Sequence, residues 1–465
     1  MNRRFFLKSG FASLGICAST QGMANGLGLL TSLANTNTNT NTNMNDYKTL
    51  VCVNLQGGAD TTSLFVPSQT TDFNRYKKIR QNLTYDQNIL RAIKPININI
   101  GDYSMPNFMN GMLDLFDNNK LSIVSNVGPL REPTTLGMIK QTKTVLPPFM
   151  GSHNDQENLW QAGVMNTNET SGWGGRIIEA LNAQSSLIPS NISLVGSRKL
   201  LRGKHISPFT VDPEAVRNLS KFINPLSSQD EPIRSIFNRL LAVGGNSLDQ
   251  TYKSTIDSAL ENNKLLKSTL DEANDADIVY PFQNPNPMVE QELNIFTKQL
   301  KRAAQLIESA PSLGQHRQII FLQMNAFDTH DNQSVMFPAL MQAVAESLKA
   351  FQSDLESRGV DDRVVTFSTS EFGRTMTINS NGTDHGWGGH QFVMGTPVNG
   401  GQLIGSLPEF EIGSSDVYEN AIIPQYSVEQ YAGNLAKWFG INSSQILDIF
   451  PNYNRFNDID FGLFS

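Results

Sequence analysis

Short apolar runs that end in polar and charged residues recur along the chain. The stretches 49–55, 318–324 and 364–367 are nearly continuous in apolar and β-branched residues, which is typical of strands covered on both faces. Other segments repeat apolar residues at helical spacing. Together these patterns predict further strands at 121–125, 192–195 and 391–395, and helices at 107–116, 172–182, 293–307 and 337–355 and directly after Ser152 and Ser427. The alternation favours an α/β fold with a mostly parallel central sheet and helices on both of its faces.

Charged residues follow three of the predicted strands at the point where each strand ends. Because the carboxyl ends of parallel strands lie along one edge of a sheet, we expect the three loops to form one composite site. A plainer interpretation makes the first acid a turn or N-cap residue and the later Asp-His pair a hydrogen-bonded pair in a glycine-rich loop. The residues concerned are Asp60 after the first run, Asp328 and His330 after the second, and Glu371, Arg374, Asp384, His385 and His390 after the third.

These loops supply three carboxylates and three imidazoles, which are usual ligands of zinc-like ions. The set is large enough for two ions with about three protein ligands each, and two close cations can clamp a phosphate or sulfate ester. Zinc is the ion we expect first, as one ion or two, with calcium, magnesium and manganese as alternatives. Arg374 is a candidate contact for a free oxygen of the ester. The candidate metal ligands are Asp60, Asp328, His330, Asp384, His385 and His390.

Ser152 opens a predicted helix, and two interpretations of it stay open. Ser152 with Asp155 three residues later is typical of a helix N-cap. A serine hydroxyl at a helix start also lies where backbone N–H groups hold an anion, so Ser152 is a candidate nucleophile. His153, Asp155 and Glu371 are candidates for supporting the ligands and the nucleophile.

The N-terminus indicates export from the cytoplasm. Asn2 to Lys8 resembles a twin-arginine motif, and a short apolar stretch and small residues follow it, so we expect a signal peptide over 1–24 that the Tat translocase recognises. The apolar stretch is too short for a membrane span, which needs about 20 residues. We therefore expect a periplasmic or secreted protein with no stable membrane span after cleavage.

Charge and low-complexity sequence limit partners and domains. Removal of a leader with three basic residues and no acidic ones takes the net charge from −7 to −10, which argues against nucleic acid as a partner. The Asn-Thr repeat within 25–46 predicts a disordered linker. We expect residues 47–465 to form one domain with a largely helical insertion at about 199–310. The oligomeric state is left open.

Several motifs, taken in order, resemble the bacterial DUF1501 family: GGAD, SHNDQ, FDTHDNQ, EFGRT and GTDHG with a following His. The resemblance covers about residues 47–440. The family bears twin-arginine leaders and is grouped with the alkaline phosphatase and sulfatase superfamily, which implies an alkaline phosphatase-like three-layer sandwich.

The resemblance also implies roles for single residues. Asp60, Asp384 and His385 resemble the superfamily's ligands of one ion, and Asp328, His330 and His390 those of a second ion. Ser152 stands where the superfamily places its hydroxyl nucleophile. Two features depart from the superfamily: Asp328 and His330 lie two residues apart where phosphatases usually have four, and the Cys-x-Pro-Ser-Arg signature of formylglycine sulfatases is missing.

The sequence therefore predicts an exported, metal-dependent hydrolase of phosphate or sulfate esters, with an anionic ester as substrate. A phosphodiesterase that uses metal-activated water is a close variant. The alternative from another class is a non-catalytic exported binding or surface-assembly protein that retains the fold. A serine esterase is disfavoured because the chain lacks the G-x-S-x-G elbow.

Overall fold

A mixed β-sheet runs through the centre of the molecule. The computed structural model describes residues 46–183, 188–216 and 247–465, together with the single positions 232, 235 and 239. Within these residues nine strands form the sheet. In spatial order they are β13 (Leu403–Ile404), β5 (Leu121–Gly128), β12 (Gly389–Met394), β9 (Val364–Thr369), β1 (Lys48–Leu55), β8 (Arg317–Met324), β6 (Asn191–Ser193) and β7 (Phe209–Thr210), and β16 (Tyr426–Ser427) also pairs with β5.

Strand β1 lies in the middle and is parallel to both of its neighbours. Val51 pairs with Ile320 of β8 on one side and with Thr366 of β9 on the other. Strand β12 is antiparallel to β9 and to β5, so β5 again points the same way as β9. The carboxyl ends of β1, β5, β8 and β9 consequently lie along one edge of the sheet, and the loops that leave this edge can meet.

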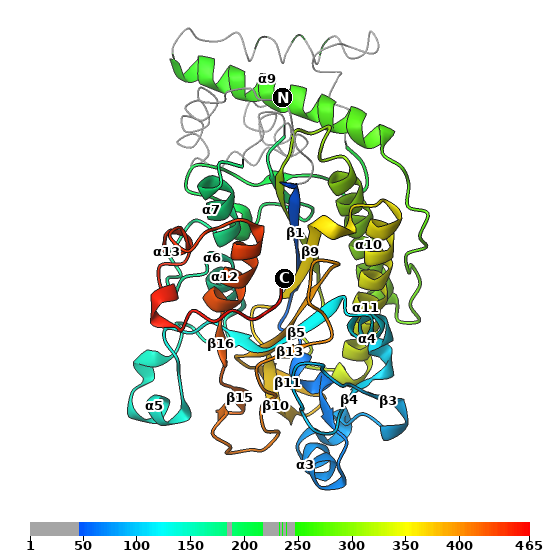
Figure 1. The fold of residues 1–465 in the computed structure, drawn as a ribbon, viewed down its shortest axis with the longest axis vertical. Coiled ribbons are helices and arrows are strands. Elements are labelled where there is room, and N and C mark those ends of the chain that lie inside the picture. The colour runs from blue at the N-terminus through cyan, green and yellow to red at the C-terminus, as the bar shows by residue number, and fades with distance from the viewer. Residues whose placement is uncertain (1–45, 184–187, 217–231, 233–234, 236–238, 240–246) are drawn as a thin grey trace.

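Helices cover both faces of the sheet. Because strand side chains alternate, Val51 and Val53 pack into one apolar cluster while Leu50 and Cys52 pack into the other. The first cluster includes side chains of α4 (Asn110–Asp117), α10 (Pro287–Glu308) and α11 (Gln333–Ser357), and the second includes those of α6 (His153–Ala162), α7 (Trp173–Ala180) and α12 (Val428–Phe439). Figure 1 shows the two groups on opposite sides of the sheet. The expected α/β sandwich with a mostly parallel sheet is confirmed.

Smaller elements surround this core. Three short sheets pair β2 (Val66–Pro67) with β4 (Tyr103–Pro106) and β3 (Leu90–Ala92), β10 (Arg374–Asn379) with β11 (Gly382–His385), and β14 (Val417–Tyr418) with β15 (Ala421–Ile422). The remaining α-helices of the described residues are α3 (Thr70–Arg80), α5 (Leu136–Gln141), α9 (Ser247–Glu272) and α13 (Ile446–Ile449). None of the helices in the described part of the chain is both long and apolar enough to cross a membrane.

The predicted strands and helices are present, with boundaries that shift by up to six residues, but one other segment was predicted wrongly. The glycine-rich segment around Asp384 and His385 was expected to be a loop, but residues 374–385 form the antiparallel hairpin of β10 and β11, in which Arg374 pairs with His385. Within the proposed insertion at 199–310, β7 belongs to the central sheet and α10 packs on it, so these two elements are parts of the sandwich. The expected signal peptide and nearly all of the expected linker fall on residues 1–45, outside the described residues.

Candidate metal centre

The loops after β1, β8 and β9 meet at the carboxyl edge of the sheet. Gly57 has φ +120°, and a side chain on it would place Cβ 2.3 Å from the backbone nitrogen of Asp328. Only glycine lets the first loop approach the second this closely. Gly382 of the hairpin is similar, because its Cβ would lie 2.2 Å from the carbonyl oxygen of Thr329. The two glycines thus allow three segments from distant parts of the chain to touch.

Three side chains from these segments and from the start of α6 converge at this edge. One ligand atom each of His153, Asp328 and His385 lie within 4.8 Å of one another. His385 Nε2 is 3.3 Å from Asp328 Oδ1, and His153 Nε2 is 3.5 Å from Asp328 Oδ2. The ring of Phe372 packs against both imidazoles. Two imidazoles and one carboxylate at such separations match a protein metal site with positions left for water or substrate.

The outer nitrogen of each of these histidines is fixed by an oxygen. His385 Nδ1 donates to the carbonyl of Gly151 at 2.6 Å, and His153 Nδ1 donates to Glu371 Oε1 at 2.9 Å. Because these oxygens only accept, the proton resides on Nδ1 and the Nε2 lone pair faces the cluster. Such outer contacts are the usual support of metal-ligating histidines.

His330 lies beside the three. Its Nε2 is 2.7 Å from His385 Nε2 and 3.2 Å from Asp328 Oδ1. Two bare lone pairs repel at this distance, so a proton or a cation has to lie between the imidazoles. His330 is therefore a fourth candidate ligand.

Electrostatics at the cluster favour an ionised carboxylate. Partial burial works against ionisation of Asp328, but the hydrogen bond from Arg374 lowers its pKa overall. The hydrogen bond to Glu371 raises the pKa of His153, whereas burial lowers the pKa of His385. The neutral form of His385 that a metal needs is thus favoured by the fold itself.

Arg374 holds the loops in place. All three guanidinium nitrogens donate to the protein: Nε to the carbonyl of Gly58 at 2.7 Å, Nη1 to that of Thr383 at 2.9 Å, and Nη2 to Asp328 Oδ1 at 2.5 Å. The side chain is completely buried. In this position Arg374 acts on Asp328 and on the backbone, and the expected contact with a substrate oxygen is not available to it.

Asp60 lies outside the cluster. Its carboxylate is buried, forms an ion pair with Arg80 and accepts a hydrogen bond of 2.6 Å from Gln333 Nε2. The negative charge of Asp60 is therefore neutralised by Arg80, the last residue of α3. His153, which the sequence placed only in a supporting role, is instead the third member of the cluster with Asp328 and His385.

His390 and Asp384 also have other partners. The backbone N–H of Asn126 donates to His390 Nδ1 at 3.0 Å, so the proton of the neutral, fully buried ring is on Nε2 and the ring offers no lone pair to an ion. Asp384 is largely exposed, accepts from Asn379 and lies 3.6 Å from His330 Nδ1. Of the six predicted ligands, the structure brings Asp328, His330 and His385 together, with Asp384 at their margin.

Ser152 is the N-cap of α6. Its Oγ accepts from the backbone N–H of Asp155 and donates to Asp155 Oδ2 at 2.6 Å. The capping interpretation is thus confirmed. Ser152 also stands between Gly151, whose carbonyl accepts from His385, and His153 of the cluster, so its backbone lies next to the candidate centre.

Comparison with known proteins assigns the family. A family model described as "Protein of unknown function (DUF1501)" matches residues 47–449. The chain belongs to the DUF1501 family. No curated protein matches it in sequence. Among solved structures, Ps i-CgsB in complex with k-i-k-neocarrahexaose is 9% identical with a TM-score of 0.33, over 88% of this chain and 76% of that one. The PsFucS1 sulfatase from Pseudoalteromonas sp. is 9% identical with a TM-score of 0.33, over 90% and 72% of the two chains.

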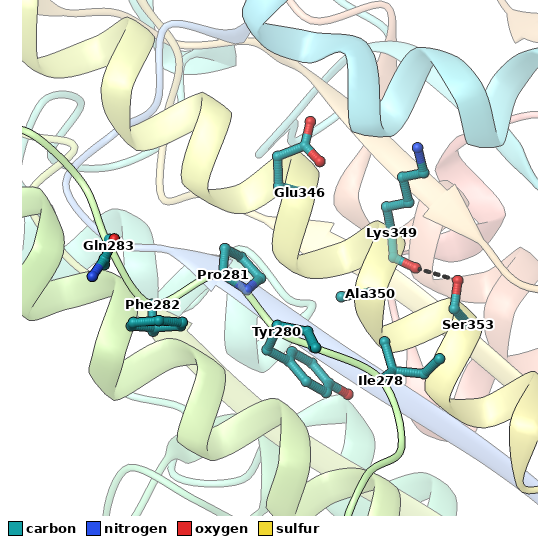
Figure 2. Close-up of a pocket in the computed structure, with 10 residues that line it drawn as sticks. Ile278, Tyr280, Pro281, Phe282, Gln283, Glu346, Lys349, Ala350 and Ser353 are labelled. Atoms are coloured by element: carbon teal, nitrogen blue, oxygen red, sulfur yellow. Dashed lines mark hydrogen bonds between the residues drawn. The ribbon is translucent and has the colours of Figure 1, made fainter.

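This DUF1501 protein also has a surface pocket away from the candidate centre. It has a volume of ≈ 480 Å³ and is lined by residues 278–283 and by one side of α11 from Glu346 to Ser353 (Figure 2). Since a helix rises about 1.5 Å per residue, Glu346 is roughly 20 Å along α11 from its start beside His330. Lys349 in this pocket is bonded to Asp114, and no group of candidate metal ligands is found there among the described residues. The pocket is separate from the candidate centre.

Proposed function

We propose that this DUF1501 protein is an exported, metal-dependent hydrolase of phosphate or sulfate esters. The observation that carries the proposal is the convergence of His153, Asp328 and His385 with the outer nitrogen of each histidine fixed by an oxygen. Fixing these side chains lowers their conformational entropy, and the binding of an ion to three preoriented ligand atoms offsets that loss. Export rests on the sequence of the first 24 residues.

The donor set fits a borderline transition ion better than a hard one. Calcium and magnesium prefer shells made of oxygen, whereas two or three imidazoles and one carboxylate suit zinc, manganese or iron. Zinc remains the first choice. When bound, such an ion supplies a Lewis acid that polarises the ester and stabilises the charge that develops on it.

One ion has better support than two. The remaining donors for a second ion are His330 Nδ1 and Asp384 Oδ1, which are 3.6 Å apart. Asp60 is neutralised by Arg80, and His390 offers no lone pair in this geometry. Of the six predicted ligands, only two side chains are then left for the second position, fewer than a stable site needs.

Ser152 is the nucleophile that this proposal favours. Its oxygen would form a bond to phosphorus or sulfur while the bond to the leaving alcohol breaks, and its proton passes to Asp155, which is already in contact at 2.6 Å. The departing alkoxide takes up a proton from water. A second water then attacks phosphorus or sulfur, the bond to Ser152 Oγ breaks, phosphate or sulfate leaves with the protons of that water, and the serine oxygen takes back the proton held by Asp155.

The second candidate is a non-catalytic binding protein that keeps the ion for structure. A specific observation favours it: Arg374 and Ser152, the two groups assigned to chemistry from the sequence, are both engaged by the protein. With the guanidinium of Arg374 and the hydroxyl of Ser152 both hydrogen-bonded to the protein, the site is suited to holding the loops together.

Metal content and turnover measured together separate the candidates. We expect the protein exported by its own leader to carry about one zinc per chain and to hydrolyse 4-nitrophenyl phosphate or 4-nitrophenyl sulfate. His385→Ala should lose both, while His205→Ala, at an exposed histidine, should keep both. Bound zinc without turnover on either ester would favour the binding protein that keeps the ion. A wild type without metal and without turnover would overturn the hydrolase and favour a binding protein that keeps the fold with no ion.

A further inference from the structure

A small cavity lies beneath the candidate centre, between the sheet and α6. The space in it open to the centre of a water molecule is ≈ 10 Å³, about that of one water. Glu371, Trp160, Glu157 and Thr369 are among the residues that line it. Glu371 also belongs to the candidate centre, because its Oε1 accepts from His153.

Two buried polar atoms of these residues have no partner among the residues that the structure describes. They are Trp160 Nε1 and Glu371 Oε2. Trp160 is 4% exposed and the Glu371 side chain is fully buried. Glu371 Oε1, by contrast, accepts from His153, from the backbone of Gly57 at 2.8 Å and from Gln56 at 3.2 Å. One oxygen of the carboxylate is thus saturated and the other is not.

The chemistry of the two atoms selects the occupant. An indole N–H only donates and a carboxylate oxygen only accepts, so the molecule between them has to accept from one and donate to the other. A metal cation or ammonium cannot accept from Trp160. An anion is repelled by Glu371 and Glu157. Water does both, and its second hydrogen can reach Thr369 Oγ1, whose own hydrogen is used on Asn54 Oδ1 at 3.0 Å.

We propose that one buried water bridges Trp160 Nε1 and Glu371 Oε2, and that Trp160 is thereby a positioning residue for His153 in the candidate metal centre. The water fixes the second oxygen of Glu371 and hence the rotation of its carboxylate. That rotation sets the direction of the hydrogen bond to His153 Nδ1, which aims Nε2 at the ion. The role in metal binding rests on the proposed function, whereas the water bridge itself does not.

The structure of the metal-free, full-length protein tests the bridge directly. A crystal structure that shows ordered water should contain one molecule about 3 Å from both Trp160 Nε1 and Glu371 Oε2. An empty cavity overturns the proposal. This result does not depend on whether any variant folds.

A matched pair of variants tests the positioning role. Trp160→Phe removes the unpartnered N–H. Trp173 also lines the cavity, and Trp173→Phe removes an N–H that already donates to the carbonyl of Trp160 at 3.2 Å. Loss of a residue that supports a metal ligand typically weakens metal binding about 10-fold. We therefore expect Zn²⁺ affinity to fall about 10-fold in Trp160→Phe and less than about 2-fold in Trp173→Phe. Competition with a chelator measures both affinities. The visible spectrum of bound Co²⁺ should change only in Trp160→Phe.

Each other outcome has a definite meaning. Equal effects of the two variants on Zn²⁺ affinity and on the Co²⁺ spectrum would overturn the positioning role. A wild type that binds neither ion, although its crystals contain the water, would refute the proposed metal centre and leave the bridge standing.

Discussion

The carboxylate of Asp60 belongs to a buried ion pair, and this decides what the residue can do. Asp60 and its partner Arg80 are each about 1% exposed. Breaking a buried pair by removing one charge typically costs about 3–5 kcal/mol, because the other charge stays buried without compensation. Stability and metal binding therefore respond differently to a change at this residue.

Asp60→Asn is expected to lower the free energy of unfolding by about 3 kcal/mol and to leave Zn²⁺ affinity within about 2-fold of the wild type. Urea unfolding and chelator competition measure the two quantities. The double variant with Arg80→Met removes both charges and should recover part of the loss. A large drop in Zn²⁺ affinity with little loss of stability would instead make Asp60 a ligand.

His390 gives a prediction about pH. Complete burial lowers the pKa of this imidazole to about 3, against about 6.5 in an unfolded chain. Between these values the unfolded state binds a proton that the folded state does not, so stability falls as the pH falls below 6.5. From pH 7.5 to pH 5 the loss due to His390 should be about 2 kcal/mol.

The variant His390→Gln keeps an acceptor for the N–H of Asn126 and does not titrate. Its unfolding free energy should therefore depend on pH less steeply than that of the wild type, by about 2 kcal/mol over this interval. His205→Gln, at an exposed position, is the control and should keep the wild-type slope. Identical slopes for all three proteins would mean that His390 takes up a proton in the folded state.

At the scale of single elements, two helices start in the same way but differ in location. Ser152 caps α6 beside the candidate centre, and Ser427 caps α12 with a capping box. Replacing either serine by alanine should cost about 1 kcal/mol of stability. Ser152→Asn keeps a capping oxygen, so it should keep most of the stability while abolishing turnover of 4-nitrophenyl esters if Ser152 is the nucleophile.

Ser427→Ala is the matched control, with reduced stability and normal turnover. Full turnover in Ser152→Asn would contradict the nucleophile assignment and leave the serine with its capping role alone. Unfolding midpoints and initial rates on the same preparations measure both effects.

The hairpin of β10 and β11 shows where local pattern reading failed. Many glycines near Asp384 and His385 favoured a loop, yet Thr375, Met376 and Thr377 alternate as a strand does. The hairpin pairs Arg374 with His385. The arginine that holds the loops and one candidate ligand therefore lie on adjacent strands. The alternation was the signal that would have predicted it.

At the scale of the whole molecule, the sequence predicted what local pattern determines. Continuous apolar runs locate β1, β8 and β9, and their parallel adjacency predicts that Asp328 and His385 meet. The partner of Asp60 could not be predicted, because Arg80 comes from a weakly amphipathic helix whose docking depends on tertiary contacts. The reversed direction of β12 likewise depends on the connection and not on its own residues.

The last prediction uses the distance along the chain between the candidate ligands. His153 starts α6, Asp328 follows β8 and His385 ends β11, so an ion bound to all three joins segments that separate on unfolding. An ion that binds only the folded state stabilises it by about 2.7 kcal/mol at a free concentration 100 times Kd. Urea unfolding with Zn²⁺ at that excess, and again with a chelator, should differ by this amount in the wild type. The difference should vanish in His385→Ala and persist in His205→Ala. Equal stability with and without Zn²⁺ in the wild type, at concentrations where binding is measured, would mean that the unfolded chain binds the ion as tightly as the folded one, and would contradict a site that only the folded cluster provides.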